Sequence, residues 1–273
     1  MRTIVESGSQ AFQLPRSMVH ARTVEPLDGR SLRLLYWLLW EAHDRGRWPR
    51  QDDDPSAMMV RYCANEMRAG AGLDSDNSYR GVREALDRLA SARIHGVGET
   101  EWGTGHLVAG FTELPGPHFQ IVFPSLLAAA NWQPLSRYAL VNMGHIRALR
   151  RPLDFAIYLR ACEVARARHP QFQLGLEEIA NISGSEQEVS WSALRRPFLG
   201  ACERVTAAAG GRLLIQAWCR GDYHGVDSFM IHVGVHGHAM NERFPARHRA
   251  HYYEVDANGS RRYQPGKQRG IVG

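Results

Sequence analysis

Lysine is almost missing from this sequence, since Lys267 is the only one and the other basic side chains are arginines. A P-loop places a lysine on the nucleotide phosphates, and a serine or threonine follows that lysine. Gln268 follows Lys267 instead. We therefore exclude nucleotide hydrolysis at a P-loop. The high arginine content is also typical of GC-rich genomes, so by itself it indicates no function.

Cysteines are few and widely spaced, at Cys63, Cys162, Cys202 and Cys219. No C-x-x-C pair is present, which argues against a zinc ribbon or a thioredoxin-like site. We expect the first three in helices and Cys219 in or beside a strand, as small buried side chains in a reducing compartment. No apolar run approaches the length of a membrane span, and the N-terminus lacks the apolar core of a signal peptide. These absences predict a cytoplasmic protein without a membrane segment.

The composition is that of a folded globular chain, with 44% hydrophobic and 22% charged residues. Its 273 residues are enough for two domains of ordinary size. The formal net charge of +5 and the pI of about 9.2 indicate a mild preference for polyanions.

From Ser190 onward the sequence has the pattern of an amphipathic helix. The apolar positions that share one side are Leu194, Phe198, Cys202 and Val205. Arg195 and Arg196 lie off that side near the helix start, and Ser190 or Ser192 is a suitable N-cap. Pro197 lacks a backbone donor, so we expect either a kink there or a helix that begins near Arg195.

Two apolar runs follow this helix, at 213–218 and 229–233, and a polar glycine-rich turn at 221–225 separates them. This pattern predicts a two-stranded ribbon. A helix followed by a ribbon is the second half of a winged helix, in which the helix enters a DNA major groove and the ribbon lies along the backbone. The same pair of elements also occurs in other α+β domains.

The first half of the chain has a similar order of elements. We expect helices at 31–42, 58–68 and 79–92, a hairpin of 94–98 with 106–111, and a strand at 118–123. The third of these helices has an apolar inner face. Its outer face carries Tyr79, Arg80, Arg83, Asp87 and Arg88.

In the second half, we expect a strand at 138–141 and helices at 153–167 and 174–182, ahead of the helix and ribbon described above. The halves share element order without close sequence identity. The sequence therefore predicts an α+β fold of two tandem winged-helix domains, 29–130 and 131–235. We expect residues 1–28 to form a flexible arm and 236–273 a basic C-terminal tail, which either neutralises phosphates or is simply solvated.

The C-terminal histidines invite a metal or catalytic interpretation: they are His232, His236, His238, His248 and His251. Without a nearby cysteine or carboxylate pair, such histidines are more typical of an ordinary surface. His236 and His238, with Tyr252 or Tyr253, are similar to the paired histidines and tyrosine of rolling-circle nicking enzymes. Glycine stands between these histidines where those enzymes have an apolar residue. We predict no metal, no cofactor and no catalytic residue.

The stretches that carry a family resemblance are 34–41 and 79–89 in the first half, and 182–185, 194–195, 200–205 and 213–218 in the second. Together they resemble the iteron-binding initiators of plasmid replication, most closely the TrfA type and more distantly the RepA, RepE and Pi types. The resemblance spans about 31–235. It lies mostly in core positions, so it supports the fold more than the mechanism, and Pro197 and the C-terminal tail depart from it.

The resemblance implies a sequence-specific double-stranded DNA-binding protein that binds direct repeats, called iterons, at a plasmid origin. Such a protein helps to open adjacent DNA and recruits the host replication initiator and the replicative helicase. It also implies a homodimer that binds the repeats less well and represses its own gene, and it requires no enzyme activity. The alternatives are a winged-helix transcription regulator without initiator activity and, from another class, a DNA-nicking enzyme.

The candidate DNA-binding residues lie on the outer faces of two helices, the one expected at 79–92 and the one that follows Ser190, or are basic residues near these helices. Arg195 and Arg196, with Arg80 and Arg83, are the first choices for base contacts, because the guanidinium fork matches guanine. Those expected to contact phosphates are Arg204, Arg212 and Arg220. The remaining candidates are Tyr79, Arg88, Ser190 and Ser192.

Overall fold

The computed structural model describes residues 10–44, 59–73, 79–95, 104–124, 138–184, 189–210, 212–222, 225–235, 252–256 and 259–263. The chain divides into two compact units, one of Val5–Phe155 and one of Ala156–Gly273 with Met1–Ile4. We call them the N-terminal unit and the C-terminal unit, and each is described by itself. The boundary after Phe155 differs from the boundary at 130/131 that the sequence predicts.

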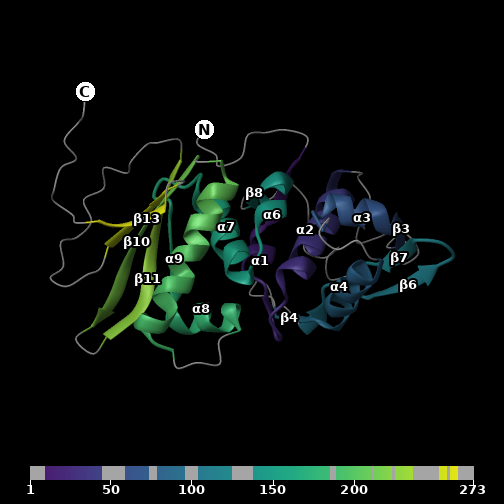
Figure 1. The fold of residues 1–273 in the computed structure, drawn as a ribbon, viewed down its shortest axis with the longest axis horizontal. Helices are drawn as coiled ribbons and strands as arrows, with labels where there is room; N and C mark the ends of the chain where they lie inside the picture. The colour runs from purple at the N-terminus through teal and green to yellow at the C-terminus, as the bar shows by residue number, and fades with distance from the viewer. Residues whose placement is uncertain are drawn as a thin grey trace. The chain divides into compact units, whose positions relative to one another are not determined.

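The N-terminal unit contains helices and short antiparallel strands (Figure 1). Its helices are α1 (Arg16–Val19), α2 (Gly29–Asp44), α3 (Ala64–Gly70), α4 (Tyr79–Ser91), α6 (Met143–Ala148) and the start of α7 (Pro152–Val164). Its strands are β1 (Ala11–Pro15), β2 (Arg22–Thr23), β3 (Met59–Cys63), β4 (Arg93–His95), β5 (Thr104–His106), β6 (Gly110–Leu114), β7 (His118–Val122) and β8 (Tyr138–Asn142).

The C-terminal unit continues α7 and adds two more helices to one sheet. The helices are α8 (Leu176–Ser183) and α9 (Trp191–Ala208). The strands are β9 (Gln171–Gly175), β10 (Leu213–Asp222), β11 (Gly225–Val235), β12 (Tyr252–Asp256) and β13 (Gly259–Tyr263). They are hydrogen-bonded in the order β13-β12-β10-β11-β9. The α+β prediction is confirmed. No described helix is both long and apolar enough to cross a membrane.

The two units share one order of elements. In the N-terminal unit, α2, β3, α3 and α4 are followed by the short strands β4 and β5 and then by the β6–β7 hairpin, and β3 pairs with β7. In the C-terminal unit, α7, β9, α8 and α9 lead to the β10–β11 hairpin, and β9 pairs with β11. Both units therefore contain a helix, a strand, two helices and a hairpin in this order, and the first of these strands pairs with the second strand of the hairpin. Strands β4 and β5 are additional in the N-terminal unit, and β12 and β13 are additional in the C-terminal unit.

The first strand of each unit differs from the sequence prediction. Residues 58–68 were expected as one helix, but β3 occupies 59–63 and α3 begins at Ala64. Burial alternates along β3, with Val60 and Tyr62 buried, because strand side chains point to opposite faces in turn. Likewise, the helix expected at 174–182 begins at Leu176, and β9 precedes it. The hairpin expected at 94–111 is two separate pairings: β4 pairs with β5, and β6 pairs with β7.

Parts of the expected flexible arm and C-terminal tail pair as strands where the structure describes them. In the arm, β1 pairs antiparallel with β8, and Phe12 and Leu14 of β1 are buried. In the tail, β12 pairs with β10, and β13 pairs with β12. Val255 of β12 is fully buried. An apolar side chain on every second residue gives each segment a face to bury. Residues 1–9, 236–251 and 264–273 lie outside the described residues.

Aromatic side chains close the core of the N-terminal unit around α2. The ring of Trp37 meets that of Tyr62 edge to face, with centroids 5.2 Å apart. Gly70, the last residue of α3, packs against the same indole. A Cβ atom at this position would lie 1.9 Å from Trp37 Nε1, so only glycine fits there without a shift of the ring. Of the cysteines, Cys162 and Cys202 are buried in helices as predicted, whereas Cys63 ends strand β3.

Candidate nucleic-acid interface

The start of α9 is defined by a serine cap. Ser190 is the N-cap residue, and its Oγ accepts a hydrogen bond from the backbone N–H of Ala193 at 3.4 Å. The helix begins at Trp191 and runs through Pro197, so of the two alternatives for Pro197 the later helix start near Arg195 is wrong. The arginine pair therefore belongs to the second turn of an established helix.

We expect Ser190→Ala to lower the free energy of unfolding by about 0.5–1 kcal/mol, because an orphan N–H of the first helical turn loses its acceptor. Ser192→Ala is the matched control, since Ser192 is exposed and its Oγ lies 3.2 Å from Ser190 Oγ without capping a backbone donor that the structure shows. Urea denaturation followed by circular dichroism measures both. Equal losses in the two variants would contradict the cap assignment.

The exposed side of α9 carries three arginines at helical spacing. Arg195 and Arg196 are exposed, and neither has an ion pair or hydrogen bond in the part of the chain that the structure describes. One turn on, a Cβ atom at Gly200 would lie 3.3 Å from Arg204 Nη1, so the third guanidinium lies beside this glycine. We call Ser192, Arg195, Arg196, Gly200 and Arg204 the α9 face.

The opposite side of α9 is fixed to the sheet. Phe198 stacks on Phe229 of β11 with ring centroids 4.1 Å apart, and both rings are fully buried. Trp191 lies between Phe229 and Tyr253 of β12, at 4.9 and 6.0 Å. Rings from two strands therefore set the rotation of the helix about its axis.

The β12–β13 hairpin contacts the second half of α9 through two hydrogen bonds. The Ser260 N–H donates to Glu203 Oε1 at 3.0 Å, and Thr206 Oγ1 donates to the Asp256 carbonyl at 3.0 Å. Glu203 is the carboxylate of α9 nearest to Arg204 in sequence, and this bond directs it toward β13. Arg195 and Arg196 therefore carry the positive charge of the α9 face that no described side chain compensates.

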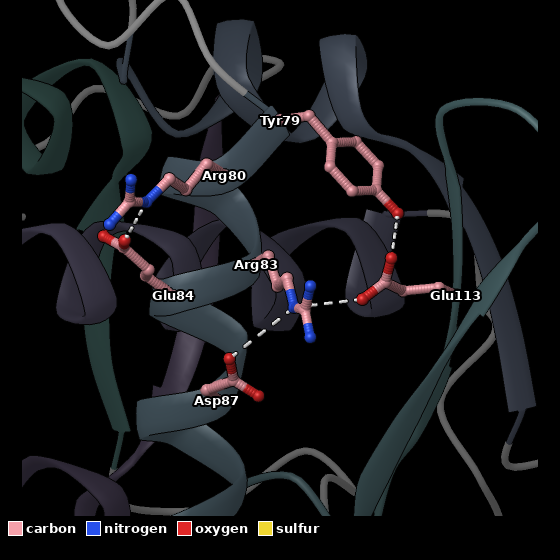
Figure 2. A network of polar contacts seen from close by, with 6 residues as sticks. All are labelled: Tyr79, Arg80, Arg83, Glu84, Asp87 and Glu113. Atoms are coloured by element: carbon pink, nitrogen blue, oxygen red, sulfur yellow. Dashed lines mark hydrogen bonds and ion pairs between the residues drawn. The ribbon is translucent and has the colours of Figure 1, made fainter.

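The corresponding helix of the N-terminal unit, α4, is balanced by carboxylates (Figure 2). Arg80, whose side chain is 83% exposed, donates to Glu84 one turn further on at 2.7 Å. This hydrogen bond raises the pKa of Arg80 above its ordinary value. Arg80 and Glu84 form the i,i+4 pair that neighbouring turns of a helix bring together.

Glu113 of β6 joins the hairpin to two side chains of α4 (Figure 2). One carboxylate oxygen, Oε2, accepts from the Tyr79 hydroxyl at 2.8 Å, and the other, Oε1, lies 3.0 Å from Arg83 Nε. Asp87 is the second acid at Arg83, at 4.0 Å. Tyr79 also stacks on Phe119 of β7 with centroids 4.8 Å apart. Desolvation, and then the hydrogen bond to Glu113, raise the pKa of Tyr79 above its ordinary value.

Arg88 is tied to another helix of the same unit. It donates through Nη1 to Asp28 Oδ2, and Asp28 Oδ1 accepts from the Ser31 N–H at 2.8 Å at the start of α2. Burial pushes the pKa of Asp28 upward, but the Ser31 hydrogen bonds and Arg88 outweigh it and hold that pKa below its ordinary value. The arrangement gives Arg88 a structural contact.

The structure therefore separates the eleven candidate residues into groups. The α9 face brings Arg195, Arg196, Arg204 and Ser192 together, and Ser190 caps the same helix. Tyr79, Arg80 and Arg83 lie together on α4 but are engaged by carboxylates. Arg212 is half-buried after α9, and Arg220 lies in β10 opposite Ser228. The side chain of Arg220 lies outside what the structure describes.

Sequence reasoning missed Glu113 and did not weigh Glu84. The spacing of Arg80 and Glu84 was a usable signal, because i,i+4 pairs of opposite charge meet on a helix. Glu113 had no such signal, since it lies 34 residues from Tyr79 along the chain. Among the described residues, no group of three histidine, cysteine or acidic side chains could hold a metal ion. His236, His238, His248 and His251 lie outside those residues.

Comparison with known proteins gives a similarity of fold. No protein-family model matches the sequence, and no curated protein matches it significantly. A solved structure that is similar is the crystal structure of the Pi initiator protein in complex with iteron DNA. The alignment covers 84% of this chain and 99% of that chain, with a TM-score of 0.57 and 8% sequence identity. At this identity the similarity shows an initiator-like fold and nothing finer.

Proposed function

We propose that this protein is a sequence-specific double-stranded DNA-binding initiator of plasmid replication, which binds direct repeats at an origin. The observation that carries the proposal is the fold similarity over nearly the whole of a chain whose structure is in complex with iteron DNA. Both units have a third helix that precedes a hairpin, which supports the winged-helix part of the proposal, and a winged helix uses these two elements on DNA. Such a protein acts in the cytoplasm.

The α9 face supports the same proposal. Exposed Arg195 and Arg196 carry charges that no described side chain neutralises, and guanidinium groups pair bidentately with guanine or with phosphate. With two DNA-binding units on one chain, binding of one unit raises the effective concentration of the other at the adjacent DNA. Opening of adjacent DNA, recruitment of the host initiator and helicase, and a homodimer with weaker binding at the repeats belong to this proposal. None of these steps needs a catalytic residue of this chain.

The test is a footprint of the purified protein on the DNA that flanks its own gene, at about 0.15 M salt, since lower salt inflates nonspecific binding. We expect protection at several direct repeats, each about two helical turns long. A single inverted repeat would support a transcription regulator in place of an initiator. Protection no stronger than on random DNA would show that neither α4 nor α9 recognises sequence and would overturn the proposal.

A further inference from the structure

The two DNA-facing helices differ in how their charges are compensated. On α4, two arginines, Arg80 and Arg83, face three carboxylates, Glu84, Asp87 and Glu113. On the α9 face, Arg195 and Arg196 have no acidic partner among the described residues. Phosphate binding requires uncompensated positive charge. The α4 surface therefore offers no uncompensated positive charge to a DNA backbone, whereas Arg195 and Arg196 of the α9 face do.

Glu113 is the carboxylate that comes from outside the helix. Glu84 and Asp87 lie one turn from their arginines on α4, whereas Glu113 is held out by β6 and contacts both Tyr79 and Arg83 (Figure 2). Stacking on Phe119 holds the Tyr79 ring, and the Tyr79 hydroxyl in turn holds the Glu113 carboxylate. The Glu113 carboxylate is thus positioned to pair with the Arg83 guanidinium.

We propose that Glu113 is a specificity-determining positioning residue, which holds Arg83 away from DNA phosphates so that the N-terminal unit does not bind random sequence. The inference rests on the proposed function, because it concerns the DNA surface of the same protein. The Arg83 and Glu113 side chains are 55% and 38% exposed, and an ion pair as exposed as this adds little stability. DNA with suitable bases can therefore displace it, with guanine accepting from Arg83 and a cytosine amino group donating to Glu113.

The test compares Glu113→Gln with the wild-type protein on a fluorescently labelled duplex of random sequence. We expect the variant to bind about three- to tenfold more tightly at about 0.1 M salt, the effect of one more phosphate contact. The slope of log affinity against log salt should become steeper by about 0.9. The preference for the footprinted sequence over the random duplex should fall, because binding to random DNA rises.

Two further variants separate this role from general charge and from a structural effect. Glu25→Gln removes one negative charge from an exposed position between β2 and α2 of the same unit. Arg83→Ala should change random-sequence binding little in the wild-type background, yet remove the whole gain in the Glu113→Gln background. The inference is overturned if Glu113→Gln matches Glu25→Gln, or if the gain persists without Arg83.

These results are distinguishable from failure of the proposed function. A footprint at direct repeats with no difference between Glu113→Gln and Glu25→Gln would overturn the inference alone. A gain that depends on Arg83, with no sequence-specific footprint, would support the role of Glu113 on DNA and overturn the initiator proposal. Absence of DNA binding by every variant would overturn both.

Discussion

Replacing Arg195 and Arg196 together with alanine is expected to weaken binding to the footprinted sequence by about 2–6 kcal/mol, from roughly 1–3 kcal/mol for each contact. Both side chains are exposed and lack partners among the described residues, so their removal costs no internal ion pair or hydrogen bond. The fold should remain intact, because the packing of α9 depends on its other side. Fluorescence anisotropy on the footprinted duplex measures the loss.

The matched control removes the same amount of charge elsewhere. Arg151 and Arg168 are both exposed, one at the head of α7 and one after its end. Arg151→Ala with Arg168→Ala should therefore weaken binding far less than the α9 variant. Normal affinity of the Arg195→Ala, Arg196→Ala protein for its site would show that α9 does not carry the recognition.

The same experiment separates base contacts from phosphate contacts. If the two arginines contact bases, the loss should be large on the footprinted duplex and small on random DNA. If they contact phosphates, both affinities should fall together and the salt slope should decrease by about two. We expect the first result, because phosphate positions on a winged helix are more typically supplied by its hairpin.

Periodicity was sufficient to predict the two helices that carry the candidate site. In α4 the buried positions Val82, Ala85 and Leu86 follow helical spacing, and the bounds agree with the structure to within one residue. In α9 the buried Leu194 and Phe198 do the same, which left the arginines between them on the outside. Faces of long amphipathic helices are a local property of the sequence.

Short strands adjoining helices were not predictable in the same way. In β3 the alternation of Val60 and Tyr62 extends over five residues and merges directly into α3, so a single helix was an equally good interpretation. In β9 only Leu174 is buried, which leaves almost no pattern to detect. Such strands are defined by pairing with β7 and β11, and the sequence of the strand alone does not record its partner.

Contacts between distant segments account for the remaining differences. β1 pairs with β8, which lies more than a hundred residues later, and this pairing turns an expected arm into part of the N-terminal unit. The Arg83–Glu113 pair is of the same kind, since its partners come from α4 and β6. Residue type and spacing indicated which arginines lie on the outer faces of α4 and α9, where we propose that DNA binds. Which of these arginines have acidic partners depended partly on local spacing, as for Glu84 and Asp87, and partly on Glu113, which the fold brings in from β6.

Phe198→Ala is expected to lower the free energy of unfolding of the C-terminal unit by about 3–5 kcal/mol. The Phe198 ring is fully buried and stacks on Phe229, so its removal loses apolar burial and leaves a cavity between α9 and β11. Because the chain has two compact units, one global midpoint would not locate the loss. Peptide-resolved hydrogen exchange should show lower protection in α9 and β11 and unchanged protection in α2 and α4.

Phe198→Leu is the control, because it keeps most of the apolar volume and should cost less than about 1.5 kcal/mol. DNA binding then links packing to function. Since Phe198 holds the helix from the side opposite Arg195 and Arg196, the alanine variant should lose affinity for the footprinted duplex only under conditions where α9 exchanges rapidly. A loss of affinity with α9 still protected would mean that Phe198 acts on DNA by some route other than holding α9 on the sheet. If Phe198→Ala lowers the free energy of unfolding by less than about 1 kcal/mol, the ring is not packed as tightly as its contact with Phe229 implies.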